Sequence, residues 1–397
     1  MIFDTALQFH QRRLRIGIVT ETWPPEVNGV ALTIARWVEG LRQRDHTVQL
    51  VRVKQGVGDV REPADPLETL RLPGFRLPGY PQLQGGWPAQ RALLKHWRRA
   101  RPDLVHVVTE GPLGYSALRA ARRLAIPVST SFHTNFDGYS RHYHLGWLAI
   151  PIRAYLRHFH NQGIQTLVPT AELAQQLQTF GFRHTQVLAR GVDTARFSPQ
   201  RRDSYLRQQW GATPQTPVVL HVGRLAAEKN LALVVAAFQA IRHIQPAARL
   251  VLVGDGPLAA RLRTRYPDFV YCGMRQGVDL ATHYASADLF LFPSLTETFG
   301  NVVLEAMASG LAVAAFDYAA AHAHIEPGGS GWLAPFGDAE AFIAHAAALA
   351  RDFAALRRMG ESARQAMIQV DSERIYDRLE TLFLNVITGE TSCPTAG

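Results

Sequence analysis

Two glutamates separated by seven residues, Glu297 and Glu305, flank the start of an expected helix over 302–309. Gly300 and Asn301 suit that start, so Glu305 lies about five residues inside, or roughly 7 Å along the helix axis. Carboxylates accept hydroxyl hydrogen bonds, and the unpaired N–H groups of a helix start bind anions. The order along the chain is a carboxylate, a helix start and a second carboxylate. A ligand that carries a sugar, a diphosphate and a ribose in series matches this order. A helix with solvated acids is the alternative.

Two cations, Arg224 and Lys229, follow an apolar run over 218–222 and precede an amphipathic helical pattern. At the carboxyl end of a strand they would neutralise a diphosphate and stabilise it as a leaving group. The alternative is ion pairing at the surface, with Lys229 paired to Asp255 or Glu228. The residues alone leave both possibilities open.

A glycine and a histidine in the first half of the chain also follow apolar runs. Gly29 directly precedes an expected helix over 30–41, where the missing Cβ lets the backbone approach a ligand. His133 follows an expected strand over 127–132 and would place a polar group beside a reacting sugar. The chain has 16 histidines, and a structural role for His133 is the alternative. The Gly-x-Gly-x-x-Gly pattern of a dinucleotide site is absent.

Short apolar runs alternate with helical patterns throughout, which is typical of parallel sheets covered on both faces. The expected strands are 14–20, 47–53, 104–108, 127–132 and 166–169, then 218–222, 249–253, 269–272, 289–293 and 311–316. A single core stops growing at about 250–300 residues, and this chain has 397. The sequence therefore predicts an α/β fold of two doubly wound, Rossmann-like domains with the ligand site in the cleft between them.

A stretch rich in turn-forming residues, 186–217, separates the two series of strands. We therefore expect an N-terminal domain over 1–190 and a C-terminal domain over 191–371. Residues 372–386 have the apolar spacing of a helix. We expect 372–397 to cross back to the first domain as this helix and a tail. Within the second domain, 254–257 is expected to form a tight turn.

The net charge of +9 is confined to the first half of the chain. Residues 1–190 hold 24 Lys and Arg against 13 Asp and Glu, and residues 191–397 hold 18 against 20. A basic half indicates nucleic acid, an anionic membrane surface or anionic substrates. The sequence patterns of nucleic-acid-binding modules are absent, so we expect no nucleic-acid partner.

The cellular compartment follows from cysteines and apolar runs. Cys272 and Cys393 are too distant in sequence to indicate a disulfide framework, which favours a reducing compartment. No run reaches the roughly 18–20 apolar residues of a membrane span, and residues 1–13 lack a secretory signal. We expect a cytoplasmic protein.

The segment 90–101 mixes cations with large apolar residues and fits a helix lying on an anionic membrane. Leu93, Leu94 and Trp97 would enter the membrane, surrounded by Arg91, Lys95, Arg98 and Arg99. The alternative is packing under the strand expected at 104–108, with a solvated basic edge. Residues 71–88 and 139–160 also mix aromatic and basic residues, so they are expected either to contact an acceptor or membrane or to pack ordinarily.

These motifs resemble glycosyltransferase family 4, the retaining enzymes of the GT-B fold, over nearly the whole chain from Leu14 to about Val386. The resemblance implies donor-binding roles for Gly29, Arg224, Lys229, Glu297, Phe299, Gly300, Asn301, Val302 and Glu305. It implies catalytic roles for His133, Glu297, Arg224 and Lys229. The stretches 21–30, 131–137 and 190–199 look most like the branch of bacterial α-mannosyltransferases and sulfolipid or glycolipid synthases.

The chain departs from the family pattern at residues 318–322. The family often has Gly-Gly before an acid after the strand expected at 311–316, whereas this chain has Tyr318-Ala319-Ala320-Ala321-His322. The departure concerns the contacts to sugar hydroxyls, and it leaves the donor sugar open.

The resemblance implies transfer of a hexose or uronosyl unit from a UDP-sugar or a GDP-sugar such as GDP-mannose to a diacylglycerol-type lipid. The enzyme would be peripheral on the cytoplasmic membrane face and would need no cofactor and no metal. The sequence agrees, because a clustered Asp-x-Asp is absent and cations with helix ends can stabilise a diphosphate. The alternatives are a soluble or polysaccharide acceptor, a GT-B nucleotide-sugar epimerase, and a non-enzymatic binding module.

Overall fold

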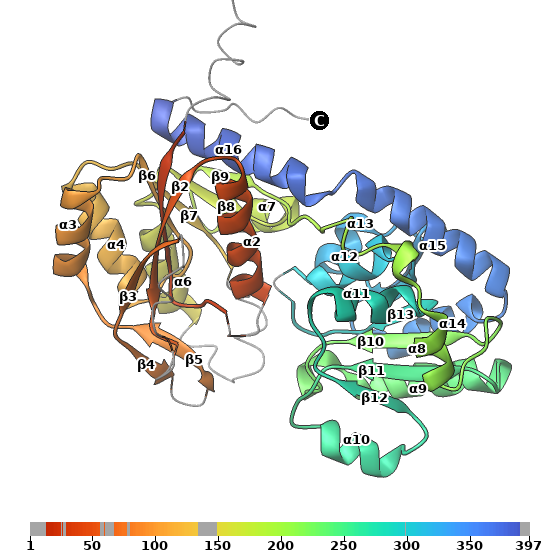
Figure 1. Cartoon of the computed structure of the whole chain (residues 1–397). Coiled ribbons are helices and arrows are strands. Elements are labelled where there is room, and N and C mark those ends of the chain that lie inside the picture. Colours follow the sequence, from red (N-terminus) through yellow and green to blue (C-terminus); the bar gives the residue numbers. More distant parts are fainter. Residues whose placement is uncertain are drawn as a thin grey trace, which may run out of the picture. The chain divides into compact units, whose positions relative to one another are not determined.

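The computed structural model describes residues 13–24, 26, 29–55, 59, 67–77, 80–133, 149–297 and 299–389. These residues form two compact units, each a parallel sheet with helices on both faces (Figure 1). The first unit contains the described residues up to Ala189 and those from Ile375 onward, and the second contains Arg190–Arg374. The predicted pair of doubly wound α/β sheets is therefore confirmed.

The first sheet has seven strands in the order β3-β2-β1-β6-β7-β8-β9. Their bounds are β1 Arg15–Thr20, β2 Thr47–Val53, β3 Glu68–Leu72, β6 Leu104–Val107, β7 Val128–Ser131, β8 Gln165–Val168 and β9 Thr185–Val187. Two further strands, β4 (Gly74–Leu77) and β5 (Tyr80–Gly86), form an antiparallel pair. The five strands expected in this half are present with ends within one residue, whereas β3, β4, β5 and β9 were not expected.

Helices cover the two faces of the first sheet in two groups. The α2 helix (Gly29–Gln43) and α16 (Ser372–Thr388) pack on the face that bears Ile16 and Ile18. The helices α3 (Gln90–Arg99), α4 (Pro112–Arg123) and α6 (Ala149–His160) pack around the opposite face, which bears Val19 and Val105, and α7 spans Ala171–Thr179. Adjacent strand residues point to opposite faces, so Ile18 and Val19 belong to different cores.

The packing of α3 corrects one expectation. Leu93 and Trp97 are fully buried and pack against α4 and β6 in the core of the first unit. They are therefore unavailable to a membrane, and their predicted insertion is wrong. The alternative holds, because Arg91, Lys95, Arg98 and Arg99 form an exposed basic edge.

The second sheet has six strands in the order β12-β11-β10-β13-β14-β15. Their bounds are β10 Val218–Val222, β11 Arg249–Val253, β12 Val270–Gly273, β13 Leu289–Phe292, β14 Ala312–Phe316 and β15 Gly331–Ala334. The α-helices of this unit are α8 Ser204–Gln209, α9 Leu231–Ile244, α10 Ala259–Arg265, α11 Gly277–Ala285, α12 Asn301–Ala308, α13 Ala319–His324, α14 Ala339–Leu349 and α15 Phe353–Ile368. Two 3-10 turns, η2 (Pro199–Arg201) and η3 (Ala227–Lys229), complete it. All five expected strands are present, and β15 is additional.

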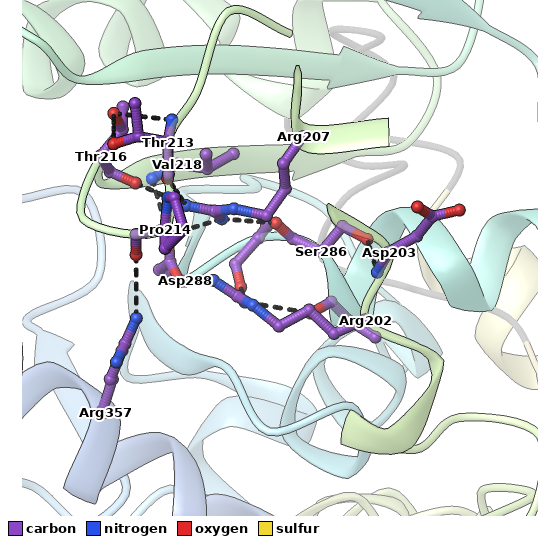
Figure 2. A network of polar contacts seen from close by, with 12 residues as sticks. Arg202, Asp203, Arg207, Thr213, Pro214, Thr216, Val218, Ser286, Asp288 and Arg357 are labelled. Atoms are coloured by element: carbon purple, nitrogen blue, oxygen red, sulfur yellow. Dashed lines mark hydrogen bonds and ion pairs between the residues drawn. The ribbon is translucent and has the colours of Figure 1, made fainter. Parts of the chain in front are cut away.

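A buried ion-pair network anchors the segment that opens the second unit (Figure 2). Asp288, directly before β13, accepts hydrogen bonds from Arg202 at 2.7 Å, from Arg207 at 3.1 Å and from the Val218 backbone N–H at 2.9 Å. Arg207 also donates to the carbonyl oxygens of Ser286, at 2.7 Å, and of Thr213 and Thr216. The side chains of Arg207 and Asp288 are 4% and 3% exposed. The network therefore ties α8 to the amino ends of β10 and β13.

Candidate functional site

The loops that follow β10 and β11 are joined by backbone hydrogen bonds. The Leu225 N–H donates to the Asp255 carbonyl at 2.9 Å, and the Leu258 N–H donates to the Leu225 carbonyl at 2.9 Å. A Cβ on Gly254 would lie 1.9 Å from the Gly223 carbonyl oxygen, and one on Gly256 would lie 2.6 Å from that of Leu225. Both positions therefore require glycine. The stretch expected as a simple turn thus fixes the backbone on which Arg224 stands.

Arg224 lies half-exposed on that backbone, with its Nη1 3.7 Å from Glu228 Oε1. Lys229 ends η3, and Asn230 follows it in the left-handed region at φ 52°, where α9 begins. The Leu295 N–H donates to the Glu228 carbonyl at 3.0 Å, which brings the loop after β13 to the loop after β10. Two loops distant in sequence are joined in this way.

Lys229 and Glu297 form an ion pair across these two loops. Their side chains are 18% and 14% exposed, so the pair is largely shielded from water. The Lys229 ammonium also lies 3.4 Å from Ser294 Oγ and 5.7 Å from the centroid of the Phe292 ring. The alternative that Lys229 pairs with Asp255 or Glu228 is wrong in its partner, since Lys229 pairs with Glu297 and Glu228 pairs with Arg224.

Tyr318 holds the backbone of Glu297 in place. The Glu297 N–H donates to the Tyr318 hydroxyl at 3.0 Å, and that hydroxyl donates to the Glu297 carbonyl. Ala319 adopts φ 54°, a left-handed conformation that is costly for a residue with a Cβ. The Ala320 N–H then donates to the Phe299 carbonyl at 2.8 Å. The sequence analysis noted Tyr318 only as part of a departure from the family pattern, and its contact with Glu297 was not expected.

The helix expected after Glu297 is confirmed as α12. Gly300 precedes it at φ 95°, a conformation that favours glycine. Phe299 is buried beneath this turn, with the guanidinium of Arg190 5.5 Å from its ring centroid. Arg190 also donates to Asn301 Oδ1 at 3.4 Å, and Val302 is half-buried. Packing under the turn therefore fixes the direction in which the first N–H groups of α12 point.

Glu305 lies in the second turn of α12 and is buried. Its Oε2 accepts a hydrogen bond at 3.2 Å from the hydroxyl of Tyr284, a fully buried residue of α11. A buried carboxylate is costly unless it is hydrogen-bonded, so Tyr284 stabilises Glu305 in this orientation. Sequence reasoning did not identify Tyr284.

The second unit thus gathers most of the predicted site residues along one edge of its sheet. They follow the carboxyl ends of two neighbouring parallel strands, β10 and β13, which meet at the same edge of a sheet, and Tyr318 follows the next strand, β14. The cations Arg224 and Lys229 suit phosphate oxygens, whereas the carboxylates Glu297 and Glu305 suit hydroxyl groups. The arrangement can bind a ligand that carries both.

The remaining predicted residues, Gly29 and His133, belong to the first unit. Gly29 is the exposed first residue of α2. His133 follows β7, and its ring centroid lies 6.3 Å from that of Trp37 on α2. Trp37 in turn lies 5.9 Å from His106, whose pKa burial lowers to about 3. Asn28 and residues 134–137, named in the same two motifs, lie outside the described residues.

A buried glutamate that sequence reasoning did not select also lies at the carboxyl edge of the first sheet. Glu21 follows β1, and its Oε1 accepts a hydrogen bond from the Leu113 N–H at 2.9 Å. Burial and the nearby Glu110 raise the pKa of Glu21 to about 7. A Cβ at position 111 would lie 1.9 Å from Glu21 Oε2, so Gly111 is required there. Glu21 therefore fixes the start of α4.

Two family models match this chain. The model described as Glycosyltransferase Family 4 matches residues 27–196, and the model described as Glycosyl transferases group 1 matches residues 216–352. Together they cover the second sheet, the first sheet except β1, and all of the predicted site residues.

Individual proteins and structures agree with these models. A GDP-mannose-dependent alpha-mannosyltransferase of Mycobacterium tuberculosis is 36% identical over 329 residues, 82% of this chain and 85% of that protein. An alpha-monoglucosyldiacylglycerol synthase of Streptococcus pneumoniae is 26% identical over 315 residues, 76% of this chain and 71% of that protein. The sucrose-phosphate synthase structure from Thermosynechococcus elongatus has a TM-score of 0.79 at 19% identity, covering 95% of this chain and 100% of that chain. Sequence and fold agree: the chain belongs to glycosyltransferase family 4 and has the two Rossmann-like domains of the GT-B fold.

Proposed function

We propose that the chain transfers a hexosyl unit from a nucleotide diphosphate sugar to a diacylglycerol-type lipid, with retention at the anomeric carbon. GDP-mannose is the first donor to test, because the relative from Mycobacterium tuberculosis is named for it. The observation that carries the proposal is the shielded Lys229–Glu297 ion pair beside Arg224 and the start of α12. It supplies a cation for the diphosphate and a carboxylate for the sugar at adjacent positions.

In this proposal each residue has a distinct task. Lys229, Arg224 and the first N–H groups of α12 bind the diphosphate and stabilise the charge that develops as it leaves. Glu297 accepts hydrogen bonds from hexose hydroxyls, and Glu305 accepts them from the ribose. His133 and Gly29 belong to the first unit, and their proposed roles rest on the family resemblance alone.

Retention is proposed through front-face displacement. The acceptor hydroxyl attacks the anomeric carbon while the bond to the diphosphate breaks, and a departing phosphate oxygen takes the hydroxyl proton. GDP-mannose carries mannose in α linkage, so an α-mannosyl product corresponds to net retention. This route needs no covalent intermediate on the protein.

A lipid acceptor is the more specific part of the proposal. One relative is named for the synthesis of a glucosylated diacylglycerol, and the basic first half suits work at an anionic membrane surface. The enzyme would then act as a peripheral protein on the cytoplasmic membrane face. A soluble or polysaccharide acceptor remains the competing function.

The proposed activity is tested by incubating the purified protein with GDP-mannose, UDP-glucose or UDP-glucuronate. Diacylglycerol or a glycosylated diacylglycerol in detergent micelles serves as the acceptor, and products are followed by mass spectrometry. We expect hexosylated lipid with GDP-mannose and little with the UDP-sugars. Formation of a free or epimerised sugar from donor alone would instead indicate an epimerase. Transfer only to a water-soluble glycan would remove the lipid acceptor.

Metal dependence is the second test. We expect hexosyl transfer to continue in excess EDTA, because Arg224 and Lys229 carry positive charge at the expected diphosphate position. Among the described residues, no group of three or more His, Cys, Asp and Glu is placed to hold a metal ion. The rate is compared before chelation, after chelation and after adding magnesium or manganese. Activity lost with EDTA and restored by either metal would contradict the proposal.

A further inference from the structure

The three helices α3, α4 and α6 carry only positive charge. They contribute nine Lys and Arg and no Asp or Glu: Arg91, Lys95, Arg98, Arg99, Arg119, Arg122, Arg123, Arg153 and Arg157. All except Arg153 are exposed. Within the described part of the chain, none of the nine forms an ion pair with a carboxylate. The charge of the eight exposed residues is therefore available to a partner, whereas the guanidinium of Arg153 stacks on the Phe180 ring at 4.0 Å.

These helices form one layer. Buried residues of α3 and α4 pack into a single core together with Phe159 of α6. Tyr115 of α4 also lies beside α6, with its ring centroid 6.4 Å from that of Tyr155 and 6.4 Å from that of Phe159. The eight exposed cations thus belong to the outer side of a continuous helical surface on one face of the first sheet.

The first turns of α6 add exposed apolar side chains to this surface. Ile150, Ile152 and Tyr155 are 75%, 47% and 42% exposed. An exposed isoleucine pair next to Arg153 and Arg157 is typical of a helix that rests at a membrane interface. Aromatic residues such as tyrosine also favour this boundary.

The same helix reaches the carboxyl edge of the first sheet. The Tyr155 hydroxyl donates to the Glu110 carbonyl at 2.5 Å, and Glu110 Oε1 lies 3.3 Å from Nε2 of His160. Glu110 is close enough to Glu21, directly after β1, to influence its carboxyl group. The exposed turns of α6 therefore lie beside the edge where parallel strands present ligand-binding residues.

We propose that the outer surface of α3, α4 and α6 docks on an anionic lipid bilayer, with Ile150 and Ile152 entering its interface. The proposal rests on the proposed lipid acceptor and names the surface through which the enzyme reaches it. Among the described residues, no helix is long and apolar enough to cross a membrane. Attachment through cations and a short apolar turn is reversible.

The surface is tested by sedimenting the full-length protein with vesicles. One set contains phosphatidylglycerol and phosphatidylcholine, and the other contains phosphatidylcholine alone. We expect binding to the anionic vesicles only, weakening as salt rises, because screening shortens the range of the charges. Arg119→Gln/Arg122→Gln/Arg123→Gln should lower binding at low salt by about tenfold or more. Ile150→Ser/Ile152→Ser should lower vesicle binding by a similar factor. This loss relative to the unchanged protein should persist at higher salt, because burial of apolar groups is not screened by ions.

Matched variants in the second unit serve as controls. Arg261→Gln/Arg263→Gln/Arg265→Gln removes the same charge from the exposed surface of α10. Tyr205→Ser/Ile368→Ser removes two apolar side chains that are 67% and 41% exposed. Both controls should bind vesicles like the unchanged protein. All four variants should keep its unfolding temperature and its stabilisation by GDP-mannose.

The outcomes separate this surface from the transfer activity. Vesicle binding lost in the first-unit variants alone supports the docking surface, and unchanged transfer to lipid in detergent micelles shows that the active site is intact. Vesicle binding could also follow the expected pattern while neither the unchanged protein nor any variant transfers a sugar. In that case the proposed function fails and the docking surface stands. The docking surface is overturned if the control variants lose as much vesicle binding as the first-unit variants. It is also overturned if the unchanged protein does not bind vesicles.

Discussion

Replacing Lys229 by alanine is expected to weaken binding of the sugar donor by about 2–4 kcal/mol, or roughly 30- to 1,000-fold. The ammonium is largely shielded from water, so its interaction with a phosphate is weakly screened. Its loss also removes the ion pair between Lys229 and Glu297. Isothermal titration with GDP-mannose measures the effect. The control is Arg242→Ala, which removes an exposed cation paired with Asp268 on the same unit and should leave affinity unchanged.

The Lys229–Glu297 pair also predicts opposite effects for two ligands. A diphosphate must compete with Glu297 for the Lys229 ammonium, so Glu297→Gln should bind GDP at least as tightly as the unchanged protein. The same variant should transfer sugar more slowly, because the amide accepts fewer hydroxyl hydrogen bonds than the carboxylate. The proposed roles of both residues would be wrong if Glu297→Gln lost affinity for GDP. They would also be wrong if Lys229→Ala kept the donor affinity of the unchanged protein.

The Asp288→Asn substitution is expected to lower the free energy of unfolding of the second unit by about 3–5 kcal/mol. Asparagine keeps the shape of the side chain but removes the negative charge between Arg202 and the buried Arg207. Urea denaturation followed by tryptophan fluorescence measures the change. Asp268→Asn is the control, because its pair with Arg242 is exposed and contributes about 1 kcal/mol or less.

A double variant separates lost charge balance from lost packing at this network. Arg207→Met with Asp288→Leu removes both charges together and fills much of the same space. It should be more stable than Asp288→Asn, because no buried guanidinium is left without its carboxylate. If Asp288→Asn proves as stable as the control Asp268→Asn, the ion-pair network contributes little to the stability of the second unit.

The buried strands were predictable because both of their faces lie under helices, which makes them continuous apolar runs. The edge strands β3 and β9 were missed, since Glu68–Leu72 and Thr185–Val187 contain polar residues and are only partly buried. The error at Trp97 has a different cause. An amphipathic helix has the same residue spacing whether its apolar face meets a protein core or a membrane, so only the packing of α3 distinguishes the two.

The chemistry of the site was more predictable than its contacts. Residue type and position after a strand selected Lys229 and Glu297, but 68 positions separate them, and no local pattern specifies that they pair. The contact of Tyr318 was not expected for the same reason, because its hydrogen bonds reach back 21 positions to Glu297. Glu21 lies within a motif noted in the sequence. Its raised pKa, however, depends on Glu110 and on burial, which the sequence does not reveal.

The packing of α16 has a consequence for the order of folding during synthesis. Leu379, Leu382 and Phe383 are fully buried against α2 residues such as Trp37, so they complete the core of the first unit. The ribosome must make all of Arg190–Arg374, the second unit, before these residues emerge. At about 5–20 residues per second, the apolar face of α2 waits on the order of ten seconds or more for its cover. The described part of the second unit is continuous in sequence and can fold in that interval, so the half of the protein that is made first is finished last.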